Sequence, residues 1–183
     1  MTRTGFKEVK EKLEKFKTNG GLAGYKLDDI VLPHKDVDGL AADFGDYIID
    51  DSWKKKMNTS NGKEFPVANK ATPVKTAQIR KIFSEIKSLH IKYEESKGSD
   101  INELLNDIDR ELLLLIPKIT FAKARKNLLG SKDKNLGDIF ILAIEACRKG
   151  LNDTNRNRHE NFERLYQFIE SLVAYHKQYS EDK

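Results

Sequence analysis

The stretch that decides the fold occupies positions 76–95 and reads TAQIRKIFSEIKSLHIKYEE. Its apolar residues recur at spacings of three and four, which is the period of one face of an α-helix. They are Ile79, Ile82, Phe83, Ile86, Leu89 and Tyr93. Thr72 and Pro73 lie shortly before it, a capping residue followed by the residue favoured at a first helical position. The pattern predicts an amphipathic helix that ends near Glu95.

The same period recurs on both sides of this stretch. It is found in residues 4–17, 36–57, 101–115, 119–129, 136–147 and 162–176. Asn19-Gly20-Gly21 should end the first of these helices, and Ser99 or Asp100 should cap the helix that begins at Ile101. Residues 22–35 contain Gly24, Pro33 and a short apolar run and are predicted to be loop, with a short strand as the alternative. Residues 58–73 lack apolar periodicity and are predicted to be a linker or loop.

Two residues should interrupt the helical pattern. Pro117 lacks a backbone donor and clashes with the preceding turn, so we expect a kink or a restart before Ile119. Gly150 should end the helix that starts at Leu136, as a C-cap. Cys147 extends the apolar stripe of that helix and is predicted to lie in the core.

These patterns predict an all-α fold, a compact bundle of about five to six helices with an N-terminal extension. We divide the chain into a helix and loop extension, residues 1–35, and a helical-bundle domain, residues 36–183. A chain of 183 residues with 38% hydrophobic residues is long enough to bury a core. No fixed-period repeat indicates a solenoid.

Composition indicates the cellular compartment and the class of partner to expect. The single cysteine, Cys147, excludes an internal disulfide and indicates a reducing compartment. The N-terminus carries charged residues instead of an apolar signal core, and no apolar run reaches the length of a membrane span. We therefore expect a cytoplasmic protein without membrane contact. The net charge of +4 is compatible with a polyanionic partner but supports one only weakly.

Catalytic and cofactor chemistry is not expected. The four histidines, His34, His90, His159 and His176, form no His-x-x-x-His pair or known histidine–acid ladder, so we predict no metal site. Neighbouring acids such as Asp107 and Asp109 are typical of a solvated helix face. No glycine loop has the Lys-Ser or Lys-Thr that cradles phosphates, so no cofactor is predicted.

Basic residues form two predicted ridges. Arg80 and Lys87 are seven residues apart and share one side of their helix, and Lys118 and Arg125 repeat this spacing on the next helix. Such ridges suit sequence-independent binding of phosphates, and together they could form a groove wall. The alternative is a solubilising surface. Phe121 lies between Lys118 and Arg125 and could stack on a base. We prefer to interpret it as a core residue.

Three segments carry a resemblance to a known family. Their shared positions are Thr76, Ile79, Arg80, Lys118, Phe121, Arg125, Val173, Ala174 and Tyr175. In this order and spacing they resemble the small helical subunit of the type III-A CRISPR (Csm) effector complex, over roughly residues 40–177. Ala124 and Phe121 depart from the glycine and tyrosine common at those positions. The resemblance does not cover the N-terminal extension. We interpret Tyr175 and His176 as structural.

The resemblance implies an all-helical, non-catalytic subunit that stacks as a short filament in antiviral defence. It implies three kinds of partner: the crRNA and target RNA backbone, other Csm subunits, and neighbouring copies of the chain. By similarity, Arg80, Lys118 and Arg125 would contact phosphates, supported by Lys75, Lys81, Lys87 and Lys123. Two alternatives stay open: the small subunit of the type III-B (Cmr) complex, and a helical protein-interaction adaptor without RNA affinity.

Overall fold

The structure is a computed structural model. It describes residues 6–23, 56–60, 63–67, 76–96, 100–124, 136–154 and 157–179. Within them are five helices: α1 (Phe6–Thr18), α4 (Thr76–Glu95), α5 (Ile101–Ala124), α6 (Leu136–Leu151) and α7 (Arg158–Tyr179). The predicted all-α bundle is confirmed. Residues 36–55 of the helix predicted over 36–57 lie outside the described residues, and so does the Thr72–Pro73 cap. Residues 56 and 57 belong to a strand, so the predicted end of that helix is wrong.

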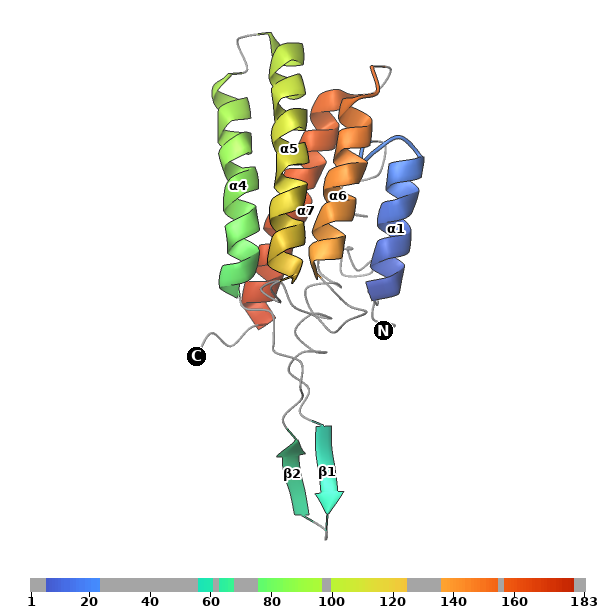
Figure 1. Ribbon diagram of the computed structural model, residues 1–183, viewed down its shortest axis with the longest axis vertical. Helices are drawn as coiled ribbons and strands as arrows, with labels where there is room; N and C mark the ends of the chain where they lie inside the picture. The colour runs from blue at the N-terminus through green and yellow to red at the C-terminus, as the bar shows by residue number, and fades with distance from the viewer. Residues whose placement is uncertain are drawn as a thin grey trace.

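The helices pack side by side around α6 (Figure 1). α6 contacts α1, α5 and α7, and α4 closes the bundle by contacting both α5 and α7. This central place explains the unusual apolarity of α6, in which Ile139, Phe140, Ala143, Ile144 and Cys147 are all fully buried. The predicted core position of Cys147 is therefore confirmed, and burial raises the pKa of its thiol well above the usual value.

α1 shares the core of the bundle. Val9, Leu13 and Phe16 are buried, and they belong to the same apolar cluster as the residues of α6. The helix ends where the sequence predicts, because Gly20 and Gly21 adopt positive φ angles of 95° and 111°. The proposed boundary at residue 35 stays a prediction, since residues 24–55 lie outside the described part of the chain.

The start of α5 matches the prediction and its middle does not. The side chain of Asp100 accepts hydrogen bonds from the backbone N–H groups of Asn102 and Glu103, at 2.9 and 3.4 Å. Of the kink or restart predicted before Ile119, the restart is wrong, because α5 runs through Pro117 to Ala124. Leu115 and Ile119 are buried on either side of Pro117, which is itself exposed. Core packing thus holds the helix, and the lost hydrogen bond lies toward solvent, where water can replace it.

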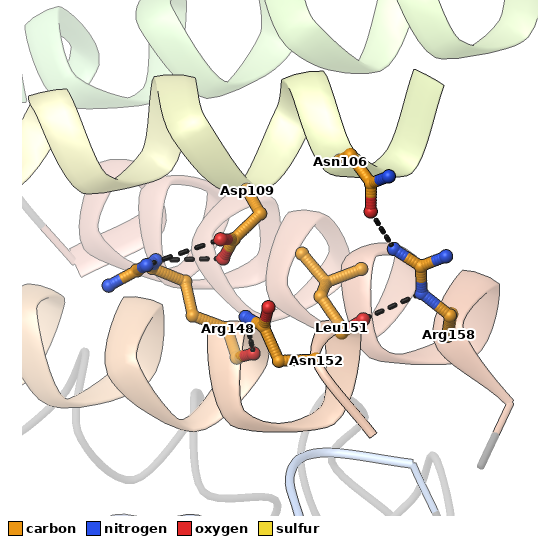
Figure 2. A network of polar contacts seen from close by, with 6 residues as sticks. All are labelled: Asn106, Asp109, Arg148, Leu151, Asn152 and Arg158. Carbon is orange, nitrogen blue, oxygen red and sulfur yellow. Dashed lines mark hydrogen bonds and ion pairs between the residues drawn. The ribbon is translucent and has the colours of Figure 1, made fainter. Parts of the chain in front are cut away.

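The C-cap predicted at Gly150 is also wrong. α6 continues to Leu151, and the Gly150 carbonyl accepts a hydrogen bond from the Asp153 backbone N–H at 3.3 Å, while side chains donate to two other carbonyls near the helix end. Asn152 Nδ2 donates to the Arg148 carbonyl at 2.8 Å, and Arg158 Nε donates to the Leu151 carbonyl at 2.6 Å (Figure 2). Glycine is required at position 150 for another reason. A Cβ at this buried position would overlap the carboxamide of Asn161.

Residues 58–73 were predicted to be a linker, and part of this prediction is wrong. β1 (Lys56–Ser60) and β2 (Lys63–Val67) form an antiparallel hairpin in which Met57 pairs with Pro66 and Asn58 with Phe65 (Figure 1). Met57, Thr59, Phe65 and Val67 have the composition of a strand, but the run is too short to show a clear period. The hairpin does not alter the helical class of the bundle.

Candidate nucleic-acid interface

A surface groove of about 350 Å³ runs between α4 and α5. Its apolar floor and its charged edges are contributed by both helices. The lining residues are Lys81, Ile82, Glu85, Leu115, Lys118, Ile119, Phe121 and Ala122. Lys81 and Lys118, two of the residues predicted to contact RNA, therefore line the same groove.

The groove is not formed by the two ridges that the sequence indicated. Lys118 lines it, but its neighbour from α4 is Lys81 and not Arg80. Consecutive residues of a helix lie about 100° apart around its axis, so Arg80 and Lys81 belong to different flanks of α4. Arg80 and Lys87 form a second basic strip, on the flank of α4 that also carries His90.

Three of the basic residues of α4 are free to meet an anion, whereas Lys92 lies 4.0 Å from Asp107 of α5. Arg80, Lys81 and Lys87 are exposed, and none of them has an acidic partner among the residues that the structure describes. Exposed cations without partners keep their full hydration and their full charge. They can therefore exchange counterions for phosphates without first breaking an ion pair.

Lys118 differs from these residues because it has an acidic partner. Its Nζ donates to Glu85 Oε2 at 3.2 Å, across the groove from α5 to α4. Both side chains are largely exposed, at 61% and 48%, so the pair is weak in water. A phosphate that binds Lys118 would compete with Glu85, an acidic residue that the sequence analysis did not single out.

Lys123 already has a carboxylate partner. Asp138, in the first turn of α6, accepts hydrogen bonds from Lys123 of α5 and from Lys10 of α1, the latter at 2.9 Å. Burial raises the pKa of Asp138, but the hydrogen bonds and charges of Lys123 and Lys10 outweigh it, so the pKa lies below its ordinary value. The Asp138 carboxylate thus joins three helices, and Lys123 is one of its two partners.

Phe121 is exposed, at 58%, so the preferred interpretation of this residue as core is wrong. It lies at the groove beside Lys118, on the solvent side of α5. Leu113 and Leu114 of the same helix and Ile91 of α4 are also exposed large apolar residues, at 47%, 59% and 47%. These four side chains are exposed individually on two adjacent helices.

For four other residues singled out in the sequence, the structure describes no side chain. Lys75 and Arg125 flank α4 and α5 at positions that the structure does not describe. Tyr175 and His176 belong to α7, but their side chains are not described. Their predicted roles stay predictions.

The sequence analysis also missed the polar contacts that hold the helices in place. Arg148 of α6 donates to both carboxylate oxygens of Asp109 of α5, at 2.8 and 3.2 Å (Figure 2). Arg158, at the start of α7, donates to Asn102 and Asn106 of α5 at 3.0 and 2.6 Å. These partners are 39 to 56 residues apart, so no local pattern reveals them.

Together the fold and the groove define a class of protein: a small helical bundle with exposed basic residues on two adjacent helices. Residues 54–182, more than half of the chain, match the model of the family described as Csm2 Type III-A. The chain belongs to this family and is a small subunit of the type III-A Csm complex, as the three segments predicted. No curated protein and no solved structure matches the chain. No described helix has the length and apolarity of a membrane span.

Proposed function

We propose that this Csm subunit binds the backbone of the crRNA and target RNA without sequence preference. Arg80, Lys118 and Arg125 are the principal phosphate contacts, supported by Lys75, Lys81, Lys87 and Lys123. The observation that carries the proposal is the groove between α4 and α5, which places Lys81 beside Lys118. Phosphates repeat along any RNA strand and attract lysines irrespective of base identity, so two lysines at one groove suit this role.

The proposed role is architectural. The exposed apolar residues Leu113, Leu114 and Phe121 of α5 support contact with neighbouring copies or other Csm subunits. We propose that this surface takes part in stacking the subunit into a short filament. Replacing Leu113 and Leu114 with serine should reduce co-purification with the other subunits and leave the helical circular dichroism unchanged. Unchanged co-purification would place the contact elsewhere.

RNA binding is tested by fluorescence anisotropy with labelled single-stranded RNA and RNA duplex over a salt series. The triple variant Arg80→Ala, Lys118→Ala and Arg125→Ala should bind more weakly, and the slope of log affinity against log salt should fall by about one unit per lost phosphate contact. The loss should be equal for RNAs of different sequence. A sequence-dependent loss would contradict backbone binding.

A matched control separates the three proposed phosphate contacts from a general effect of net charge. The triple variant Lys12→Ala, Lys15→Ala and Lys149→Ala removes the same number of charges from exposed positions on α1 and α6. It should retain most of the affinity. Equal losses in the two variants would show that only net charge matters, and absence of binding at low salt would favour an adaptor without RNA affinity. Labelled RNA should stay intact with magnesium or manganese, as expected of a non-catalytic subunit.

A further inference from the structure

α4 and α7 bring a histidine and two glutamates to one point on the surface of the bundle. His90 and Glu94 are four residues apart on α4, and Glu163 comes from α7. His90 Nε2 lies 3.2 Å from Glu163 Oε2 and 3.9 Å from Glu94 Oε1. One ligand atom of each residue lies within 4.8 Å of the other two.

The histidine is held in place before any ligand arrives. Its ring stacks on Tyr166 with a centroid separation of 3.8 Å and an angle of 11° between the planes. Phe162 and Tyr93 lie on other sides of the ring, each with a centroid separation of 6.1 Å. The His90 side chain is 17% exposed, so the ring has little freedom but is not sealed from solvent. A ligand fixed in this way loses little entropy on binding an ion.

The donor set suits a borderline divalent cation. An imidazole nitrogen and two carboxylate oxygens are ligands of Zn²⁺, at about 2.0–2.2 Å from the metal. Ligand atoms at that distance in a tetrahedral site are about 3.4 Å from one another. The His90–Glu163 separation already agrees, and rotation of the half-exposed Glu94 side chain would close the third side.

We propose that His90, Glu94 and Glu163 form a binding site for one Zn²⁺-type ion that links α4 to α7. Two carboxylates and a neutral imidazole leave the site without net charge when the ion is bound. Water completes the coordination on the open side. The inference does not depend on RNA binding.

Local sequence rules predicted no metal site because Glu163 is 73 residues away from His90. The pair His90 and Glu94 has helical ligand spacing, but alone it offers only two ligands. Only the packing of α4 against α7 adds the third. The remaining described histidine, His159, accepts or donates a hydrogen bond with the Tyr93 hydroxyl at 2.8 Å and lies outside the cluster.

The test is titration of the metal-stripped full chain with Zn²⁺. Calorimetry measures the binding, and the melting temperature measures the stabilisation. We expect one strong site and a higher melting temperature, because an ion bound only by the folded state stabilises it. Glu94→Gln and Glu163→Gln keep the side-chain shape and should each weaken binding at least about tenfold. Co²⁺ should give an absorption spectrum typical of low coordination number, which Glu163→Gln abolishes.

Controls distinguish this site from adventitious binding. Glu95→Gln changes the neighbouring exposed carboxylate on α4, and His159→Gln changes another histidine, so both should keep the wild-type affinity. Mg²⁺ should give no rise in melting temperature, since it prefers oxygen ligands. Absence of Zn²⁺ binding by the wild type would overturn the proposal, and so would wild-type affinity in both Glu94→Gln and Glu163→Gln.

Discussion

Asn161 is the polar side chain on which three segments of the bundle meet. It is fully buried, and its Oδ1 accepts hydrogen bonds from the backbone N–H groups of Leu22 and Ala23, at 2.6 and 2.9 Å. Its Nδ2 donates to the Asn157 carbonyl at 3.0 Å. Gly21 and Gly150 pack against the carboxamide, where a Cβ at either position would collide. The junction therefore needs two glycines and one amide.

This junction gives a stability prediction. Asn161→Ala leaves two buried N–H donors without a partner, so the free energy of unfolding should fall by about 2–4 kcal/mol. Asn152→Ala is the matched control, because Asn152 also bonds a backbone group but is exposed, and its loss should stay within about 1 kcal/mol. Urea unfolding measures both. Similar losses would show that the buried hydrogen bonds are not what stabilises the junction.

Glu85 gives a prediction about RNA affinity. It is the acidic residue in the groove and pairs with Lys118. Glu85→Gln frees this lysine and removes a negative charge, so RNA affinity should rise about 1.5- to 5-fold, the range of an exposed ion pair. The anisotropy assay at low salt measures the change. Glu111→Gln, an exposed carboxylate of α5 that does not line the groove, should have a smaller effect. A loss of affinity in Glu85→Gln would contradict phosphate contact by Lys118.

At the scale of elements, Asp138 links the start of α6 to α1 and α5. The pKa of Asp138 is lowered from 3.8 because its ion pairs with Lys123 and Lys10 outweigh the effect of burial. A lowered folded-state pKa means that this stabilisation is present above pH 3.8 and is lost as pH falls through the folded-state value.

Asp138→Asn tests this link. The variant should be less stable than the wild type at pH 7, and the difference should shrink as pH falls below 3.8, where the wild-type carboxylate becomes protonated. Thermal or urea unfolding over a pH series measures the difference. Glu103→Gln, an exposed carboxylate in the first turn of α5, is the control and should show little pH-dependent difference. A constant difference down to low pH would mean that the ion pairs are not responsible.

At the scale of the whole molecule, α1 and the rest of the bundle should unfold together. α1 lies before the residues that match the family model, yet Leu13 shares one apolar cluster with Leu172 of α7. Leu13→Ala and Leu172→Ala should each lower the free energy of unfolding by about 2–5 kcal/mol. Both should move a single transition, seen alike by calorimetry and circular dichroism. If Leu13→Ala leaves the main transition unchanged, residues 1–35 form a separate unit.

The sequence by itself determined the helices. Their apolar period is local, so the stripes of α1, α4, α5, α6 and α7, the Asp100 cap and the glycine stop after α1 were all predicted. The family was predicted too, because its three segments are read along the chain. The exposed charges of α4 followed from the same period.

Only the tertiary structure decided which residues of different helices contact one another. Burial of Leu115 and Ile119 carries α5 through Pro117, and packing against Asn161 puts Gly150 inside α6. The groove pairs Lys118 with Lys81 and Glu85, and α7 brings Glu163 to His90. These contacts join residues far apart in the chain, and their energies depend on distance in space. A helical period shows which side of a helix is apolar but not which helix covers it.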